Sequence, residues 1–191
     1  RASSTGGNLI IGQGLPEVTN PHTYIWHYQA NVCMQVCQHL SRIGDDGVTQ
    51  PLLLEGWNVT EDLKTWTLHV RKGVKWHNGR DFTSDDVIWN LTHSLDPDTG
   101  SSTLGLMKGY LMDDAAENLW DASAIERIDA HTLKLNCRIP QLAIPEHFNH
   151  YPLIMLDPEE KGVFGPGSNG TGPFELVEFE AQLRALLKAR S

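Results

Sequence analysis

The sequence has few cysteines and no long apolar run, and both shortages narrow the class of protein. Its 191 residues include only three cysteines, Cys33, Cys37 and Cys137, and an odd number does not form a disulfide framework. Cys33 and Cys37 are four residues apart, so on a helix they share a face and are expected to be small buried side chains. No stretch approaches the roughly 20 apolar residues that span a bilayer. No membrane insertion is therefore expected.

Positive charge is also scarce. The chain has 15 Lys and Arg against 24 Asp and Glu, which gives a net charge of -9. A nucleic-acid partner requires clustered basic residues that displace condensed counterions, so no such partner is predicted. With 40% hydrophobic and 20% charged residues, the composition is typical of a soluble globular domain. The polar start at residues 1–7 lacks a methionine and predicts a processed or recombinant end.

Motifs for catalysis and metal binding are missing. Among nine histidines, His147 and His150 are three residues apart, but there is no HExxH pattern and no tight Cys/His cluster. No GxSxG elbow occurs. The glycine-dense stretch 165–172 lacks the lysine of a P-loop and precedes a predicted strand, which favours a structural turn over a phosphate site. We therefore expect no catalytic residue, no metal, no cofactor and no enzyme activity.

Hydrophobic periodicity predicts interleaved helices and strands. Alternation in residues 65–70 predicts a half-buried strand, and Thr83-Ser84-Asp85-Asp86 predicts the start of a helix that runs to residue 95. An amphipathic helix is predicted from residue 28 to 40, and a last helix over 181–190. Further strands are predicted at 8–13, 125–128, 132–136, 152–156 and 173–179, and a short helix within 140–148. The fold class is α/β (α+β with a mixed sheet).

Aromatic residues gather after a proline-containing loop. Tyr24, Trp26 and Tyr28 lie between this loop and the predicted helix. Aromatic faces at such a junction suit a small-molecule cleft, because a large rigid contact area costs little entropy. Packing in the core is the alternative interpretation of the same residues.

Five motifs together resemble a known family. They are Asn20-Pro21-His22, the run PLLLEGW at 51–57, the run EDLKTWTLHVRKGVKWHNG at 61–79, the run DFTSDDV at 81–87 and the run GTGPF at 170–174. Their order and spacing resemble the peptide/nickel-type (family 5) extracytoplasmic solute-binding proteins of ABC importers, over roughly residues 8–180. The central motifs coincide with the predicted strands and capped helix, so they are interpreted as a folding signature, with Arg71 and Asp85 in structural roles.

The resemblance implies a domain organisation. Residues 1–180 are predicted to form the first lobe of a periplasmic-binding-protein-like fold, with about 44–165 as a family-specific subdomain inserted in it and the second lobe absent. Residues 181–191 do not resemble the family's continuation. They are predicted to be a terminal helix, either a segment returning from a second lobe or a non-native end.

The resemblance also implies a function. The chain is predicted to be the substrate-binding component of an ABC transporter that delivers peptides or similar small solutes, such as opines or metal chelates, to a membrane permease. It would act as a monomer in the periplasm, or tethered outside the cytoplasm. A nickel chelate is disfavoured because residues 152–156 lack arginine. The alternatives are a sensory or docking lobe that engages a membrane receptor, and a hydrolase or metal enzyme. The implied ligand-binding residues are Tyr24, Ile25, Trp26, His27, Thr103 and Leu104.

Overall fold

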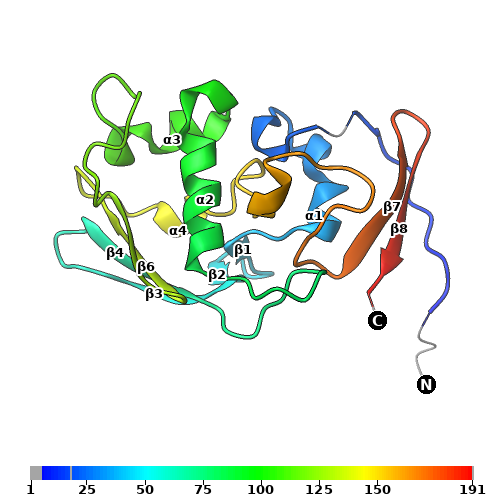
Figure 1. Cartoon of the computed structure of the whole chain (residues 1–191), viewed down its shortest axis with the longest axis horizontal. Coiled ribbons are helices and arrows are strands. Elements are labelled where there is room, and N and C mark those ends of the chain that lie inside the picture. Colours follow the sequence, from blue (N-terminus) through cyan, green and yellow to red (C-terminus); the bar gives the residue numbers. More distant parts are fainter. Residues whose placement is uncertain (1–5, 18, 191) are drawn as a thin grey trace.

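Two hydrophobic cores organise the chain in a computed structural model that describes residues 6–17 and 19–190 (Figure 1). The larger core lies between a four-stranded sheet and helices α2 (Ser84–Leu95), α3 (Ser102–Leu111) and α4 (Ile144–His147). The smaller core joins residues 24–37 to residues 154–176. Residues 1–5, within the predicted processed end, lie outside the described part of the chain.

The four-stranded sheet is built from the residues whose alternation predicted it. Its order is β3 (Leu54–Val59), β4 (Thr65–Val70), β6 (Thr132–Asn136) and β5 (Ile125–Asp129). Trp66, Leu68 and Val70 of β4 are buried, as period-two alternation requires. Every described strand pair is antiparallel. The α+β class is therefore confirmed, but the expected mixed sheet is wrong, because all the described strands pair in antiparallel fashion.

Helix α2 covers one face of this sheet and begins at the predicted cap (Figure 1). Asp86 accepts a hydrogen bond from the backbone N–H of Thr83 at 2.8 Å, which satisfies a donor that a helix start leaves unpaired. The structural roles predicted for Arg71 and Asp85 also agree with the contacts. Arg71 donates to the carbonyls of Leu52 and Leu54, and Asp85 pairs at the surface with Arg127 at 2.7 Å.

The remaining elements are short. None of the helices in the described ranges is long and apolar enough to cross a membrane. The other elements are η1 (Pro21–Thr23), η2 (His27–Ala30), α1 (Cys33–Val36), β1 (Ser41–Ile43), β2 (Thr49–Pro51), η3 (Pro97–Thr99), η4 (Pro158–Glu160), β7 (Phe174–Glu180) and β8 (Arg184–Ala189).

The predicted helix at 181–190 is wrong, because these residues form the second strand of a hairpin. Strand β8 pairs antiparallel with β7, and Leu187 lies opposite Leu176. A tight turn with Gln182 at φ 62 reverses the chain. Ala185 and Leu187 then pack against the smaller core while Leu183 and Leu186 are exposed. The leucine spacing fits a helix equally well, and only the partner strand decides between them.

Three other local predictions are also wrong. Residues 8–13 form no strand, and Ile10 is 93% exposed. The run 152–156 is buried but irregular, and its backbone at Leu156 is hydrogen-bonded by the side chain of Asn90. The helix predicted from 28 to 40 is divided into η2 and α1. Helix α1 ends where the Val36 carbonyl accepts the N–H of Gly172 at 2.7 Å.

Candidate functional site

The Asn20-Pro21-His22 motif forms a tight turn that sets the direction of the following residues. The side-chain oxygen of Asn20 accepts a hydrogen bond from the His22 N–H at 3.0 Å, and the backbone carbonyl of Asn20 accepts one from the Thr23 hydroxyl at 2.7 Å. Pro21 occupies the first position of η1, where a missing N–H costs nothing. The turn directs Tyr24 into the smaller core and brings Ile25 to the surface.

His22 anchors this turn to the interior. Its Nε2 lies 2.9 Å from the carbonyl oxygen of Ile154, and its Nδ1 lies 2.8 Å from Nδ1 of His93. Because a carbonyl only accepts, Nε2 of His22 carries the proton and Nδ1 accepts from His93. The ring of Trp89 stacks on His93, with centroids 4.6 Å apart. The turn is therefore fixed against both α2 and the segment 152–156.

Buried histidines make stability depend on pH. Burial, with a smaller contribution from the His93 charge, lowers the pKa of His22 to about 4, and burial likewise lowers the pKa of His39 to about 4. The unfolded chain, with an ordinary histidine pKa near 6.5, therefore binds protons first. Stability is full above that value and is lost as the pH falls toward 4. Urea unfolding should show a loss of roughly 2 kcal/mol for each of these histidines between pH 7 and pH 5.

Removing the two imidazoles provides the check on this assignment. The double variant His22→Gln, His39→Gln should be less stable at pH 7, and its stability should fall less steeply between pH 7 and pH 5. A slope equal to that of the unmodified protein would contradict the assignment of the pH dependence to these rings.

The structure places the predicted site residues in two layers. Ile25 and Trp26 are 63% and 58% exposed, and His27 is also exposed. Tyr24 is buried beneath them. The side-chain oxygen of Gln29 accepts hydrogen bonds from the backbone N–H groups of Ile25 and Trp26, at 3.0 and 2.9 Å. The exposed residues are therefore held in one conformation by their own loop.

The second predicted zone lies at the start of α3, which packs against η1. Thr103 is fully buried, and Leu104 is half-buried against the larger core. Within the described residues, the hydroxyls of Thr103 and Tyr24 have no hydrogen-bond partner. Packing of α3 against η1 brings the helix of the second zone against the turn that directly precedes the first zone.

A group of rings, of which only His27 was predicted as a site residue, joins the two zones. The ring centroids of His27 and Tyr151 are 6.2 Å apart in an edge-on arrangement, and those of Tyr151 and His150 are 4.7 Å apart. His150 Nε2 then lies 3.1 Å from the hydroxyl oxygen of Ser102, the first residue of α3. We call His27, Tyr151 and His150 the ring row. His27 belongs to the site that the resemblance implies, and His150 was noted only for its spacing from His147. The sequence signal for Tyr151 was its position directly before the buried run 152–156.

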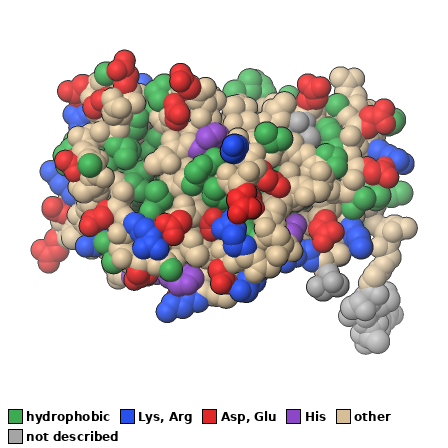
Figure 2. Space-filling model, viewed as in Figure 1, with side chains coloured by type: hydrophobic (Ala, Val, Ile, Leu, Met, Phe, Trp, Pro, Cys, Tyr) green, Lys and Arg blue, Asp and Glu red, His purple; other side chains and the backbone are tan. Residues whose placement is uncertain are grey.

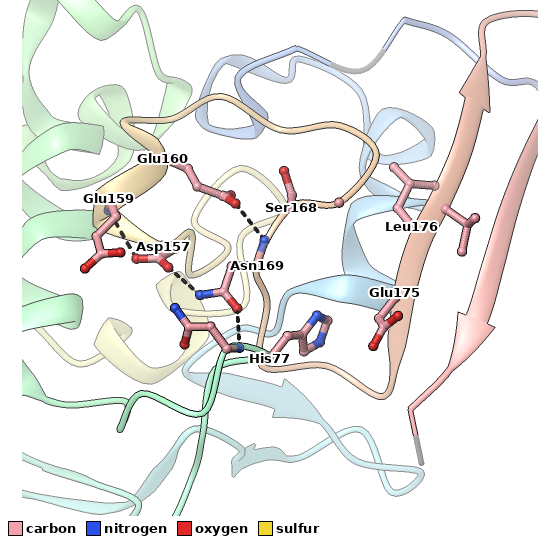
Figure 3. A pocket seen from close by; sticks show the side chains of 11 residues that line it. His77, Asp157, Glu159, Glu160, Ser168, Asn169, Glu175 and Leu176 are labelled. Atoms are coloured by element: carbon pink, nitrogen blue, oxygen red, sulfur yellow. Dashed lines mark hydrogen bonds between the residues drawn. The ribbon is translucent and has the colours of Figure 1, made fainter.

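A cavity of about 610 Å³ opens elsewhere, between the 157–160 turn, the glycine-rich loop and β7 (Figure 3). Its acidic groups mostly hold the loop in place. Asp157 accepts hydrogen bonds from Arg80 and from the Asn169 side chain, and Glu160 accepts one from the Asn169 N–H at 2.7 Å. Burial raises the pKa of Glu160. The described residues contain no group of three or more His, Cys, Asp or Glu able to hold a metal ion.

Charge is distributed rather than gathered on the face shown in Figure 2. Acidic and basic side chains alternate across it, with apolar side chains between them. The net charge of -9 therefore forms no continuous acidic region on this face.

Comparison with known proteins identifies the family. The family model for bacterial extracellular solute-binding proteins, family 5 (middle), matches residues 48–190. The chain therefore belongs to this family. The match extends through β8, so the prediction that residues 181–190 depart from the family's continuation is wrong.

Individual relatives agree with this assignment. The periplasmic oligopeptide-binding protein OppA of Haemophilus influenzae is 28% identical over 156 residues, which are 78% of this chain and 29% of that protein. The dipeptide-binding protein DppE of Bacillus subtilis is 28% identical over 156 residues, 76% of this chain and 28% of that protein. The crystal structure of Haemophilus influenzae OppA with the peptide RPPGFSPFR superposes with a TM-score of 0.79 at 24% identity, over 92% of this chain and 36% of that one. The periplasmic-binding-protein fold is confirmed, and the chain spans under a third of the length of these two curated relatives.

Proposed function

We propose that this chain is the first lobe of a periplasmic substrate-binding component of an ABC importer, which binds peptides or similar small solutes and delivers them to a membrane permease. The observation that carries the proposal is the exposed segment Ile25–His27, held rigidly beside the start of α3 in a family 5 fold. Ile25, Trp26, His27 and Leu104 would contact the solute. Tyr24 and Thr103 would support them from the interior.

Preorganisation of the loop supports binding at this place. Ligand affinity is lost when a loop must be ordered on binding, and here Gln29 and His22 have already fixed the segment. The large apolar side chains left exposed are those that a binding cleft requires. The partition of the interior into two cores supports the predicted subdomain at about 44–165, because the larger core lies between Leu40 and Met155.

Calorimetry with the full-length protein tests the proposal. A panel of di-, tri- and oligopeptides, opines and metal chelates should include at least one solute that binds. Trp26→Ala should weaken its binding at least about tenfold, because an exposed tryptophan in a binding cleft is a typical energetic anchor. The matched control is Trp120→Ala, because Trp120 is 40% exposed and its indole N–H donates to the carbonyl of Asn136, the last residue of β6. Equal affinities in the two variants, or no binding by any solute, would contradict the proposal.

One contact raises the alternative of a hydrolase. Ser102 Oγ and His150 Nε2 are 3.1 Å apart, the separation of a nucleophile and its base. Within the described residues, however, no carboxylate is hydrogen-bonded to the other ring nitrogen of His150, so the third member of such a system is missing. Binding is therefore the better-supported function. Ester or peptide hydrolysis that disappears in Ser102→Ala would reverse this choice.

A further inference from the structure

We propose that the ring row, His27, Tyr151 and His150, is the specificity-determining surface of this lobe and that it selects solutes carrying an aromatic side chain. This inference rests on the proposed function and adds the chemical class of the group recognised. It is based on the arrangement of the rings, on their exposure and on the absence of these rings from the ion pairs of the described residues.

The geometry of the ring row leaves room for a further ring. The 6.2 Å edge-on contact of His27 with Tyr151, and the 4.7 Å tilted contact of Tyr151 with His150, are separations that aromatic pairs prefer. His27 is exposed, and Tyr151 and His150 are half-buried, so each ring retains accessible surface. Trp26 precedes His27 and is itself largely exposed. A solute ring can thus extend a stack that the protein has already begun.

Ser102 holds one end of the ring row in position. The hydroxyl of Ser102 contacts the Nε2 atom of His150 and so fixes the orientation of that ring. Ser102 is therefore a positioning residue, because it contacts the ring row without belonging to it.

The ring row offers no counter-ion to a charged solute group. None of the ion pairs in the described part of the chain includes a residue of the ring row. Burial lowers the pKa of His150, and His147 adds to the effect, so its imidazole is neutral at pH 7. A charged group placed here would lose water without gaining a counter-ion, which is costly. An aromatic side chain gains contact area without that cost.

Calorimetry with the full-length protein at pH 7 and three tripeptides compares the binding of an aromatic side chain with that of a charged one. Ala-Phe-Ala is expected to bind about tenfold more tightly than Ala-Lys-Ala or Ala-Glu-Ala. Tyr151→Ala should remove about tenfold from the Ala-Phe-Ala affinity, the size of one lost aromatic contact, and less than twofold from the others. Tyr151→Phe, which keeps the ring, should recover most of the loss. Trp120→Ala is the control at a distant tryptophan.

The outcomes distinguish this inference from the proposed function. If the three peptides bind equally well, or if Tyr151→Ala weakens all three to the same extent, the inference is overturned while solute binding stands. If neither these peptides nor any other solute binds, both fail. Thermal unfolding of each variant checks folding. Should Tyr151→Ala not fold, His27→Ala at the exposed end of the row repeats the test with the same expected pattern.

Discussion

Gly170→Ala should destabilise the fold severely. A Cβ atom at this position would lie well within 3.0 Å of the Val36 carbonyl oxygen, closer than real Cβ contacts come. The obstacle is backbone, so it cannot rotate away as a side chain would. Hydrogen bonds also hold the glycine-rich loop at this place. The Gly172 N–H donates to the Val36 carbonyl at 2.7 Å, and the Gly170 carbonyl accepts from the His77 N–H at 2.9 Å. Relief of the clash would break both hydrogen bonds.

The expected loss from Gly170→Ala is at least about 3 kcal/mol, the upper range for overpacking, with broken hydrogen bonds in addition. Urea unfolding followed by tryptophan fluorescence measures it. The matched control is Gly165→Ala in the same loop, where no atom lies within 4 Å of the added methyl group. That variant should differ from the unmodified protein by less than about 1 kcal/mol. Similar unfolding midpoints for the two variants would contradict the close approach.

The structural role of the glycine-rich loop could be predicted from the sequence, but the reason for its glycines could not. The absence of a P-loop lysine indicated a structural turn, and the contacts of Gly170 and Gly172 agree with that interpretation. The reason for these glycines was not visible, because it lies in helix α1, far away in the sequence. Strand β4 and helix α2 were predictable because their burial follows their own periodicity.

The predictions that were wrong have the same physical origin, because the deciding contact comes from a distant part of the chain. In residues 184–189 a leucine pattern compatible with two periods is decided by strand β7, and in 152–156 an apolar run is hydrogen-bonded by Asn90 instead of by a neighbouring strand. The candidate site likewise contains residues that the sequence could predict and residues that it could not. Ile25–His27 could be predicted through the resemblance, whereas Tyr151 and His150 join them only through tertiary packing.

Arg80→Ala is expected to be the other severe substitution. The guanidinium donates to Asp86 at 2.7 Å and to Asp157 at 2.6 Å, and both carboxylates are almost completely buried. It also lies over the ring of Trp76, with 5.2 Å to the centroid. Removing it leaves two buried carboxylates without a cation, which typically costs about 3–5 kcal/mol. Because Asp157 also holds Asn169, the glycine-rich loop should lose its attachment to the 157–160 turn at the same time.

A second arginine provides the control for this prediction. Arg127 pairs with Asp85 at 2.7 Å, but both side chains are about half exposed, so Arg127→Ala should cost less than about 1 kcal/mol. Arg80→Lys should fall between the two alanine variants, because an ammonium group cannot reproduce the fork that reaches both carboxylates. Urea unfolding at pH 7 ranks the three variants. An Arg80→Ala loss no greater than that of Arg127→Ala would show that the buried carboxylates do not depend on this cation, and that other contacts hold α2 to the 157–160 turn.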